Sequence, residues 1–117
     1  DALAANDPES TLILWRRYAN GAADGVLLHA RADRRLRTES LCNLLAGLHD
    51  GPFYLTGDAQ FAERCLRRLG VDAERIVPVG QASLAAVTEQ LMRLNRQGQD
   101  PAVFTLFAAG NRKGFVA

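Results

Sequence analysis

The sequence predicts an α/β fold, a Rossmann-like and mostly parallel sheet with helices on both faces. Two observations indicate this class. Helical patterns alternate along the chain with short apolar runs, and a run such as Val26–Leu28 is typical of a strand that is buried on both faces of a sheet. The breaks between patterns are short, as expected where helices cross between neighbouring parallel strands. No Gly-x-Gly-x-x-Gly motif follows the first strand, so a dinucleotide site of that type is not predicted.

The first helix is predicted to begin at Asp7 and Pro8. The Asp7 carboxylate can accept a hydrogen bond from an unpaired N–H group of the first turn. Pro8 suits the first helical position, because an N–H group there has no partner within the helix. Trp15 lies on the apolar side of this helix and is expected to be a packing residue. Gly21 ends the helix, and the strand at Val26–Leu28 follows.

Two helices and two short strands are predicted for the middle of the chain. Both helices carry apolar residues at i, i+3, i+4 and i+7. Gly57 and Asp58 mark the turn and the cap before the second helix, and Gly70 caps its end. A proline within the second strand predicts an edge position or a strand end, because proline has no N–H group to donate. The stripes are Leu41, Leu44, Leu45 and Leu48, then Ala62, Cys65, Leu66 and Leu69; the strands are Phe53–Leu55 and Ile76–Val79.

The last predicted elements are a helix capped by Ser83, which ends near Gly98, and a strand over Ala102–Ala108.

Two histidines are assigned structural roles. His29 lies in an apolar strand and is expected to be a hydrogen-bonded core residue. His49 follows a leucine-striped helix and is expected to interact with the helix dipole.

Length and composition are those of a single globular domain over residues 1–117. Hydrophobic residues make up 48% and charged residues 23% of the chain. The formal net charge is only +1, so no global field favours nucleic acid, and any anion must bind locally. No apolar stretch is long enough to cross a bilayer. Cys42 and Cys65 are expected to be reduced core thiols, and no zinc-ligand spacing predicts a metal site.

Three polar segments are candidates for chemistry. The first, Asp1 to Asn6, reads as a loop between a strand end and a helix start, where open α/β sheets bind ligands. The second, residues 31–37, carries four arginines and an aspartate directly after the first strand, and guanidinium groups suit phosphates and carboxylates. The third, Gly110 to Gly114, can present backbone N–H groups after the last strand. Two alternatives stay open: the arginines can pair internally with Asp33, and the third segment can be a plain turn.

The same three segments resemble one protein family. Residues 4–11 read Ala-Ala-Asn-Asp-Pro-Glu-Ser-Thr, residues 31–37 fit Arg-Ala-Asp-Arg-x-x-Arg, and residues 110–114 fit Gly-Asn-x-x-Gly. All three are similar to the carboxy-terminal domain of the ligase subunit of poly-γ-glutamate synthase (PgsB/CapB type), within the Mur-ligase superfamily. Ala108 stands where a glycine is often found, and Arg35 falls outside the pattern, so Arg35 is expected to be solvated.

The resemblance implies roles for individual residues. It implies nucleotide binding by Asp1, Asn6 and Arg34, with Asp1 approaching the ATP ribose. It implies that the substrate or another anion is bound by Arg31, Asp33, Arg37, Gly110 and Asn111. It assigns no catalytic residue to this chain, because the phosphate loop, the Mg²⁺ ligands and the bridging lysine belong to a central domain. We therefore expect the chain to be a fragment that lacks an upstream domain and is inactive alone.

The function implied by the resemblance is ATP-dependent amide formation that polymerises glutamate through its γ-carboxylate. ATP and Mg²⁺ are the implied cofactors, and glutamate, the polymer and small membrane subunits are the implied partners. The implied location is the cytoplasmic face of the cell membrane; nucleic acid is not expected as a partner, and a homo-oligomer stays open. One alternative is another Mur-type ligase, for peptidoglycan precursors or folyl-polyglutamate. The other is an α/β interaction module without catalytic function.

Overall fold

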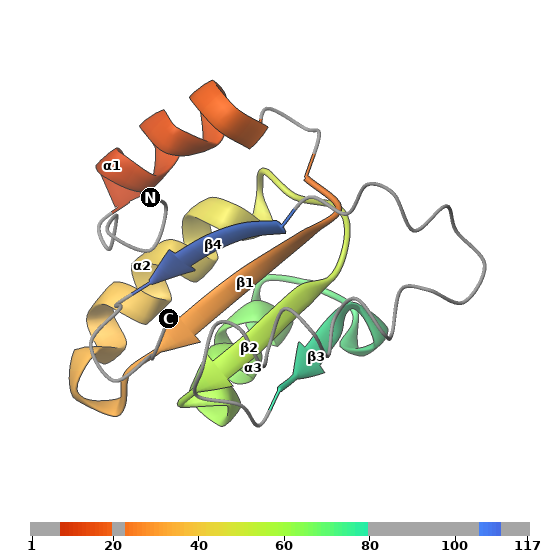
Figure 1. The fold of residues 1–117 in the computed structure, drawn as a ribbon. Helices are drawn as coiled ribbons and strands as arrows, with labels where there is room; N and C mark the ends of the chain where they lie inside the picture. Colours follow the sequence, from red (N-terminus) through yellow and green to blue (C-terminus); the bar gives the residue numbers. More distant parts are fainter. Residues whose placement is uncertain (1–7, 20–22, 80–105, 111–117) are drawn as a thin grey trace.

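The structure, a computed structural model, describes residues 8–19, 23–79 and 106–110 (Figure 1). They form an α/β fold with a four-stranded, all-parallel sheet in the order β3-β2-β1-β4, as the sequence predicts. The strands are β1 (Gly25–Ala30), β2 (Phe53–Gly57), β3 (Ile76–Pro78) and β4 (Leu106–Gly110). The helices are α1 (Pro8–Leu14), α2 (Arg35–Ala46) and α3 (Ala59–Arg68), with a π-helical turn at Trp15–Ala19 and 3₁₀ turns at Ala32–Arg34 and Ala73–Arg75.

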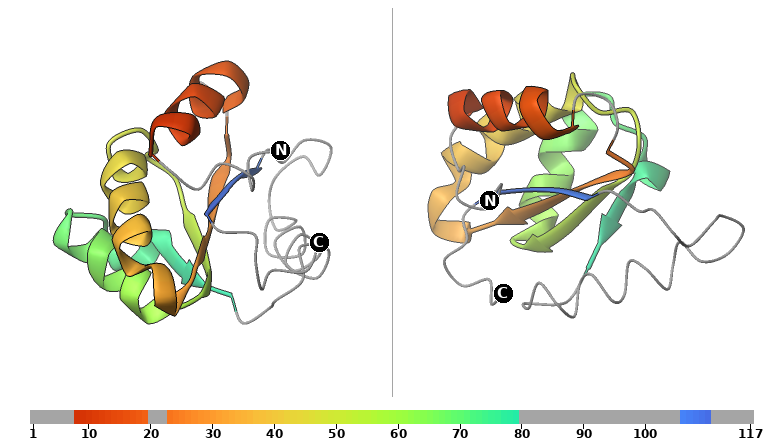
Figure 2. Two further views of the ribbon diagram at one scale, coloured as in Figure 1. Left: turned by 90° about the vertical axis from the view of Figure 1, so that its left-hand side faces the viewer. Right: turned by 45° about the horizontal axis from the view of Figure 1, so that its top comes forward.

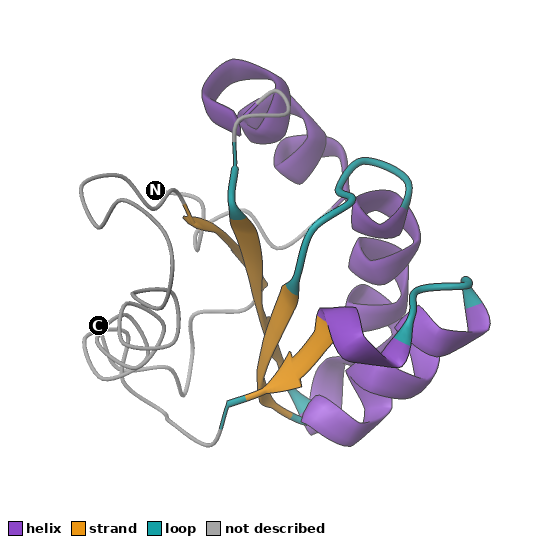
Figure 3. Cartoon of the chain, turned by 90° about the vertical axis from the view of Figure 1, so that its right-hand side faces the viewer, coloured by secondary structure: helices purple, strands orange, loops and turns teal. Residues whose placement is uncertain are grey.

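The helices α2 and α3 pack side by side against one face of the sheet (Figure 2), and α1 packs on α2. Figure 3 shows the strands as a layer with these helices on one side. The helix predicted between Ser83 and Gly98 lies outside the described residues. The crossovers that the structure describes follow the prediction, since α2 connects β1 to the parallel β2, and α3 connects β2 to the parallel β3.

The two central strands are buried on both faces. Val26 and Leu28 of β1 lie beside Phe53 and Leu55 of β2 in the register, and all four belong to the core beneath α2 and α3. The alternating residues point to the opposite face, because successive side chains of a strand alternate. These residues, which include Leu27 and its register partner Tyr54, are also buried. The prediction of a doubly buried strand at Val26–Leu28 is confirmed.

Leucine stripes orient α2 and α3, although their ends differ from the prediction. Leu41 and Leu45 are buried in the core, as are Ala62, Cys65 and Leu66. Leu69 follows the last residue of α3 and is 43% exposed, so the stripe ends one turn earlier than predicted. Gly70 follows with a φ of +92°, the left-handed conformation typical of a helix end.

Trp15 packs at the end of the first helix, as predicted. Its ring meets those of Phe107 and His49 edge-on, with centroid distances of 5.0 and 5.8 Å. Pro8 is the first residue of α1, as predicted, whereas Asp7 lies outside the described residues. This aromatic cluster connects the first helix to β4 and to the loop before β2.

The role assigned to His49 is wrong. His49 lies beyond the end of α2, and its ring is buried between Trp15 and Phe53. Its Nε2 lies 3.1 Å from the carbonyl oxygen of Pro52. Burial lowers the pKa of His49, so the ring favours the neutral form that does not interact with a helix dipole as a cation. Arg75 fixes the same loop by donating to the carbonyl oxygens of His49 and Gly51, at 2.8 and 3.0 Å.

The structure confirms one prediction at a strand end and changes another. β3 lies at the edge of the described sheet, as Pro78 predicts, and Pro78 is its last residue. β4 extends to Gly110, two residues beyond the predicted end, whereas residues 102–105 lie outside the described part of the chain. Gly110 is therefore the last residue of a strand and not the first residue of a turn.

Candidate functional site

A hollow of about 530 Å³ opens where β1 and β2 end. Parallel sheets bind ligands at the carboxyl ends of their strands. The usual place is beside the strand from which the chain adds strands first toward one edge of the sheet and then toward the other. Here that strand is β1, because the chain proceeds from β1 to β2 and β3 and later adds β4 on the other side of β1. We call this feature the strand-end hollow; its lining residues are His29, Ala30, Arg31, Ala32, Asp33, Gly57 and Asp58.

Residues 31–37 follow β1 directly, as the sequence predicts. Arg31 is still extended, with φ −109° and ψ 136°, and a 3₁₀ turn over Ala32–Arg34 leads into α2. Arg35 is the first residue of α2, so Arg37 lies on a helix and not in a loop. This geometry brings the arginines to the edge of the sheet at which the strand-end hollow opens.

Arg31 and Asp33 form an ion pair with each other at the hollow. The hydrogen bond from Arg31 lowers the pKa of Asp33, so this carboxyl group is ionised over the whole physiological range. Both residues are predicted substrate contacts. Their pairing matches the alternative of internal pairing, and a ligand would have to compete with Asp33 for the Arg31 guanidinium group.

Arg35 is exposed, as predicted, but it also has a partner. Its Nε donates to Oδ2 of Asp58 at 3.0 Å, and its guanidinium carbon lies 4.8 Å from the centroid of the Phe61 ring. This pair explains a second difference. Asp58 is the N-cap residue of α3, but its side chain makes no capping hydrogen bond, because the carboxylate faces Arg35 instead. The ion pair connects the start of α2 to the turn between β2 and α3.

Arg34 and Arg37 have no carboxylate partner among the described residues. Arg34 makes one long hydrogen bond, 3.4 Å, to the backbone oxygen of Asp33, and both arginines are exposed. Arg34 is the N-cap residue of α2, and Arg37 lies in the first turn of this helix. The first turn of α2 holds no acidic residue, and its N-terminal end carries partial positive charge. The start of α2 therefore combines the positive end of a helix with two exposed guanidinium groups that form no ion pair in the part of the chain that the structure describes.

His29 is a hydrogen-bonded residue of the buried strand, as predicted. Its Nδ1 lies 2.8 Å from Oγ1 of the buried Thr56, its register partner on β2. His29 also lines the strand-end hollow, a role that we did not predict for it. The available signal was its place on the strand, two residues before Arg31. Asp58 was likewise predicted only as a cap, although it lines the hollow.

Two glycines let neighbouring strands end close to β1. Gly57 has a φ of +75°, and a Cβ atom there would lie 2.0 Å from the carbonyl oxygen of Ala30. Gly110 has a φ of +113°, and its Cβ would lie 2.2 Å from the carbonyl oxygen of His29. Neither position accepts a side chain without moving β1. The predicted anion contact of Gly110 stays a prediction, while its tight packing against β1 is a structural reason for glycine.

Three predicted site residues, Asp1, Asn6 and Asn111, lie outside the described residues. The structure therefore brings together Arg31, Asp33 and Arg34, places Arg37 in the first turn of α2, and does not describe the ribose contact expected of Asp1. Within residues 8–19, 23–79 and 106–110, no group of histidine, cysteine or acidic side chains could hold a metal ion. Among the same residues, no helix is long and apolar enough to cross a membrane.

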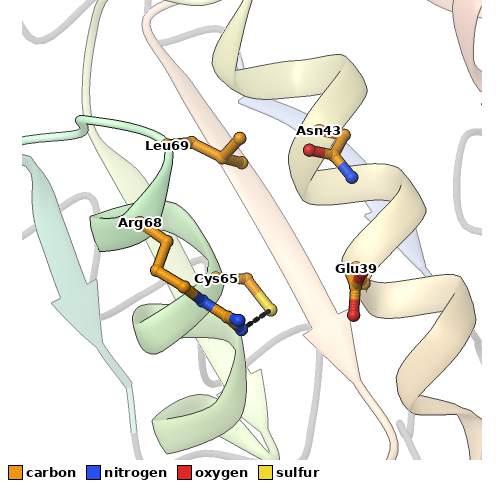
Figure 4. Close-up of a pocket in the computed structure, with 5 residues that line it drawn as sticks. All are labelled: Glu39, Asn43, Cys65, Arg68 and Leu69. Carbon is orange, nitrogen blue, oxygen red and sulfur yellow. Dashed lines mark hydrogen bonds between the residues drawn. The ribbon is translucent and has the colours of Figure 1, made fainter.

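A second, smaller hollow of about 160 Å³ lies between α2 and α3 (Figure 4). Cys65 lines it, and Nη2 of Arg68 donates to the Cys65 sulfur at 3.7 Å. Both cysteines are free and buried, as predicted. They are separate in the sequence but interact in space: burial, and then the neighbouring Cys65, raise the pKa of Cys42 to about 12. These thiols are core residues, and this hollow lies away from the predicted site.

Comparison with known proteins adds one finding. The family model described as the poly-gamma-glutamate synthase CapB C-terminal domain matches residues 1–117, the full length of the chain. No curated protein and no solved structure shows a significant match to it.

Proposed function

The chain belongs to the family of CapB C-terminal domains of poly-gamma-glutamate synthase, and from this membership we propose a specific role. The domain closes over nucleotide and incoming glutamate in an ATP-dependent ligase that joins the γ-carboxylate of one glutamate to the amine of the next. The observation that carries the proposal is that Arg34 and Arg37 are exposed, form no ion pair within residues 8–19, 23–79 and 106–110, and follow directly in the chain on residues that line the strand-end hollow.

Both chemical partners of this reaction are anions. ATP supplies the phosphoryl group that activates a carboxylate, and the incoming glutamate carries two carboxylates. Arginine binds phosphate and carboxylate through paired, coplanar N–H donors. We assign phosphate contact to Arg34, as the resemblance implies, and contact with a substrate carboxylate to Arg37. Arg31 and Asp33 then form the wall of the site, where their ion pair orients Arg31.

The Mg²⁺ ion and the groups that bind the phosphates directly are proposed to lie on the central domain of the ligase. Asp1 and Asn6 are proposed to contact the ATP ribose and to shape the first loop, and Asn111 to contact the substrate. The complete enzyme is proposed to work at the cytoplasmic face of the membrane with the subunits that export the polymer. These parts of the proposal depend on the family resemblance.

The test uses the full-length ligase that carries this domain. Arg34→Gln and Arg37→Gln should each lower kcat/KM for glutamate ligation about 10- to 100-fold, because each removes a charge-assisted hydrogen bond to an anion. The melting temperature should stay near that of the wild type, since both side chains are exposed and neither forms an ion pair with a described residue. Arg16→Gln, on an exposed side chain of the first helical segment, is the matched control. Normal ligation by both site variants would contradict the proposal and favour an interaction module.

A further inference from the structure

The exposed side of α3 carries a second concentration of positive charge. Arg64, Arg67 and Arg68 are exposed, and Arg67 and Arg68 follow Arg64 by three and four residues, so both lie on the same side of the helix as Arg64. They border a hollow of about 620 Å³ together with Gln60 and Glu63. We call these three residues the α3 arginine face.

None of the three guanidinium groups pairs with a carboxylate among the described residues. Arg68 donates to the sulfur of Cys65, and the Arg64 guanidinium carbon lies 6.0 Å from the Phe61 ring centroid. Among the described residues that line this hollow, Glu63 is the one that carries a carboxylate. The face therefore has an excess of positive charge, although the net charge of the whole chain is only +1. The C-terminal end of a helix dipole attracts cations, which explains arginines at positions 67 and 68 in the last turn of α3. Arg64 lies before this turn and is not explained in this way.

The α3 arginine face is connected to the strand-end hollow. Asp58 lines that hollow and pairs with Arg35, whose guanidinium group lies over Phe61 at 4.8 Å. Arg64 contacts the same ring from within α3. The positive groups thus follow one another from the site, past Phe61, to the far end of α3.

We propose that the α3 arginine face binds the poly-γ-glutamate chain itself, as a polycarboxylate that leads away from the site of bond formation. This inference rests on the proposed function for the identity of the polymer. Each residue of a γ-linked chain keeps a free α-carboxylate, and a row of planar carboxylates matches a row of guanidinium forks. Each exposed pair of a guanidinium group and a carboxylate contributes little, but several pairs along one polymer chain act together and raise its overall affinity.

An anionic membrane is the competing partner, and the composition of α3 argues against it. Helices that bind membranes insert apolar residues into the lipid. The apolar residues Ala62, Cys65 and Leu66 of α3 are buried against the sheet, and Phe61 is only partly exposed beneath two guanidinium groups. Leu69 at the end of α3 is 43% exposed, but a single partly exposed leucine offers little apolar area for insertion beside this charge.

The test measures polymer binding without ATP, by fluorescence anisotropy of labelled poly-γ-glutamate, on the intact ligase chain that carries the domain. Arg64→Gln/Arg67→Gln should weaken binding about tenfold at low salt, from two lost exposed pairs. High salt should remove the difference between variant and wild type. Arg16→Gln/Arg17→Gln removes the same charge elsewhere and should bind like the wild type. Arg68 is left in place because it contacts Cys65.

Equal affinity of the variant and the wild type for the polymer, or no binding by the wild type, would overturn the inference. The inference would also be overturned if the variant lost affinity for phosphatidylglycerol vesicles and not for the polymer, because this result would indicate that the face binds a lipid surface. Both variants should melt within about 2 °C of the wild type, because exposed substitutions cost little. Failure here is distinguishable from failure of the proposed function, because this assay contains no ATP and involves no ligation. In synthesis, the variant should form its first bonds at the normal rate and yield shorter chains.

Discussion

His29 and Gly110 are register partners at the ends of β1 and β4, and their backbones approach so closely that only a glycine fits at the second position. A Cβ atom on Gly110 would lie 2.2 Å from the His29 carbonyl oxygen, on a backbone with φ of +113°. The contact lies beside the strand-end hollow, at the strand where the chain reverses its direction across the sheet.

Gly110→Ala should therefore lower the free energy of unfolding by about 2–5 kcal/mol, from backbone strain and overpacking together. Gly70→Ala is the matched control, because its φ of +92° is also left-handed but no atom lies within 4 Å of its Cβ position. It should cost only about 1 kcal/mol. Urea unfolding of both variants measures the difference, and equal costs would show that the close approach to His29 contributes nothing.

The Asp58 carboxylate should stabilise the fold through Arg35 and not as a helix cap. A double-mutant cycle of Arg35→Gln and Asp58→Ala should give a coupling of about 0.5 kcal/mol, the value for a partly exposed ion pair. The coupling should fall in 1 M salt. If Asp58 acts as a cap, Asp58→Ala will cost about 1 kcal/mol whether or not Arg35 is present.

His49 should make stability depend on pH below neutrality. Burial lowers its pKa from the value near 6.5 expected in the unfolded chain, so the unfolded state binds the proton more readily. Stability from this group is complete above pH 6.5 and is lost as pH falls from there through the lower pKa of the folded state. Melting temperatures between pH 8 and 5 should fall more steeply for the wild type than for His49→Gln. Parallel curves would contradict the assignment.

The two thiols should differ in reactivity. The pKa of Cys42 is about 12, so almost none of it is thiolate at pH 8. Cys65 is buried but lines the hollow between α2 and α3, so it is the thiol closer to solvent (Figure 4). Iodoacetamide should modify Cys65 before Cys42, and Cys42 only after unfolding. Peptide mapping by mass spectrometry reads the order, and equal labelling of the folded protein would refute it.

Residues 1–117 alone should not turn over ATP, because the proposed function places the phosphate loop and the Mg²⁺ site on another domain. The measurement is phosphate release from purified protein with MgATP, with the full-length ligase as a positive control. Turnover by the 117-residue chain would show that the proposed division of labour is wrong.

Periodicity was sufficient to predict the layers of the fold. Strands buried on both faces and leucine stripes are local patterns, so β1, β2, α2 and α3 could be located from neighbouring residues alone. The partner of Arg35 could not, because Asp58 lies 23 residues away and meets it only when α2 and α3 pack together. His49 is a similar case, since its neutral state results from burial between Trp15 and Phe53.

The sequence predicts only part of the candidate site, because some of its features depend on contacts between distant residues. The position of residues 31–37 at a strand end follows from the strand alone. Which of these arginines stay unpaired depends on where Asp33 and Asp58 lie, and this requires the folded chain. Asp1, Asn6 and Asn111 stay predictions, because they lie outside the described residues.

The strand order also affects how the chain can fold while it is being synthesised. Gly25 of β1 pairs with Leu106 of β4, so one edge of the central strand is completed by a segment that leaves the ribosome much later. Until then β1, β2 and β3 can associate with one another. The edge of β1 that β4 will cover still exposes N–H and C=O groups without partners, although β1 is buried throughout its length in the finished fold. Nascent or truncated chains that end before residue 106 are for this reason the forms most exposed to edge-to-edge aggregation, and the last strand acts as the native cover of that edge.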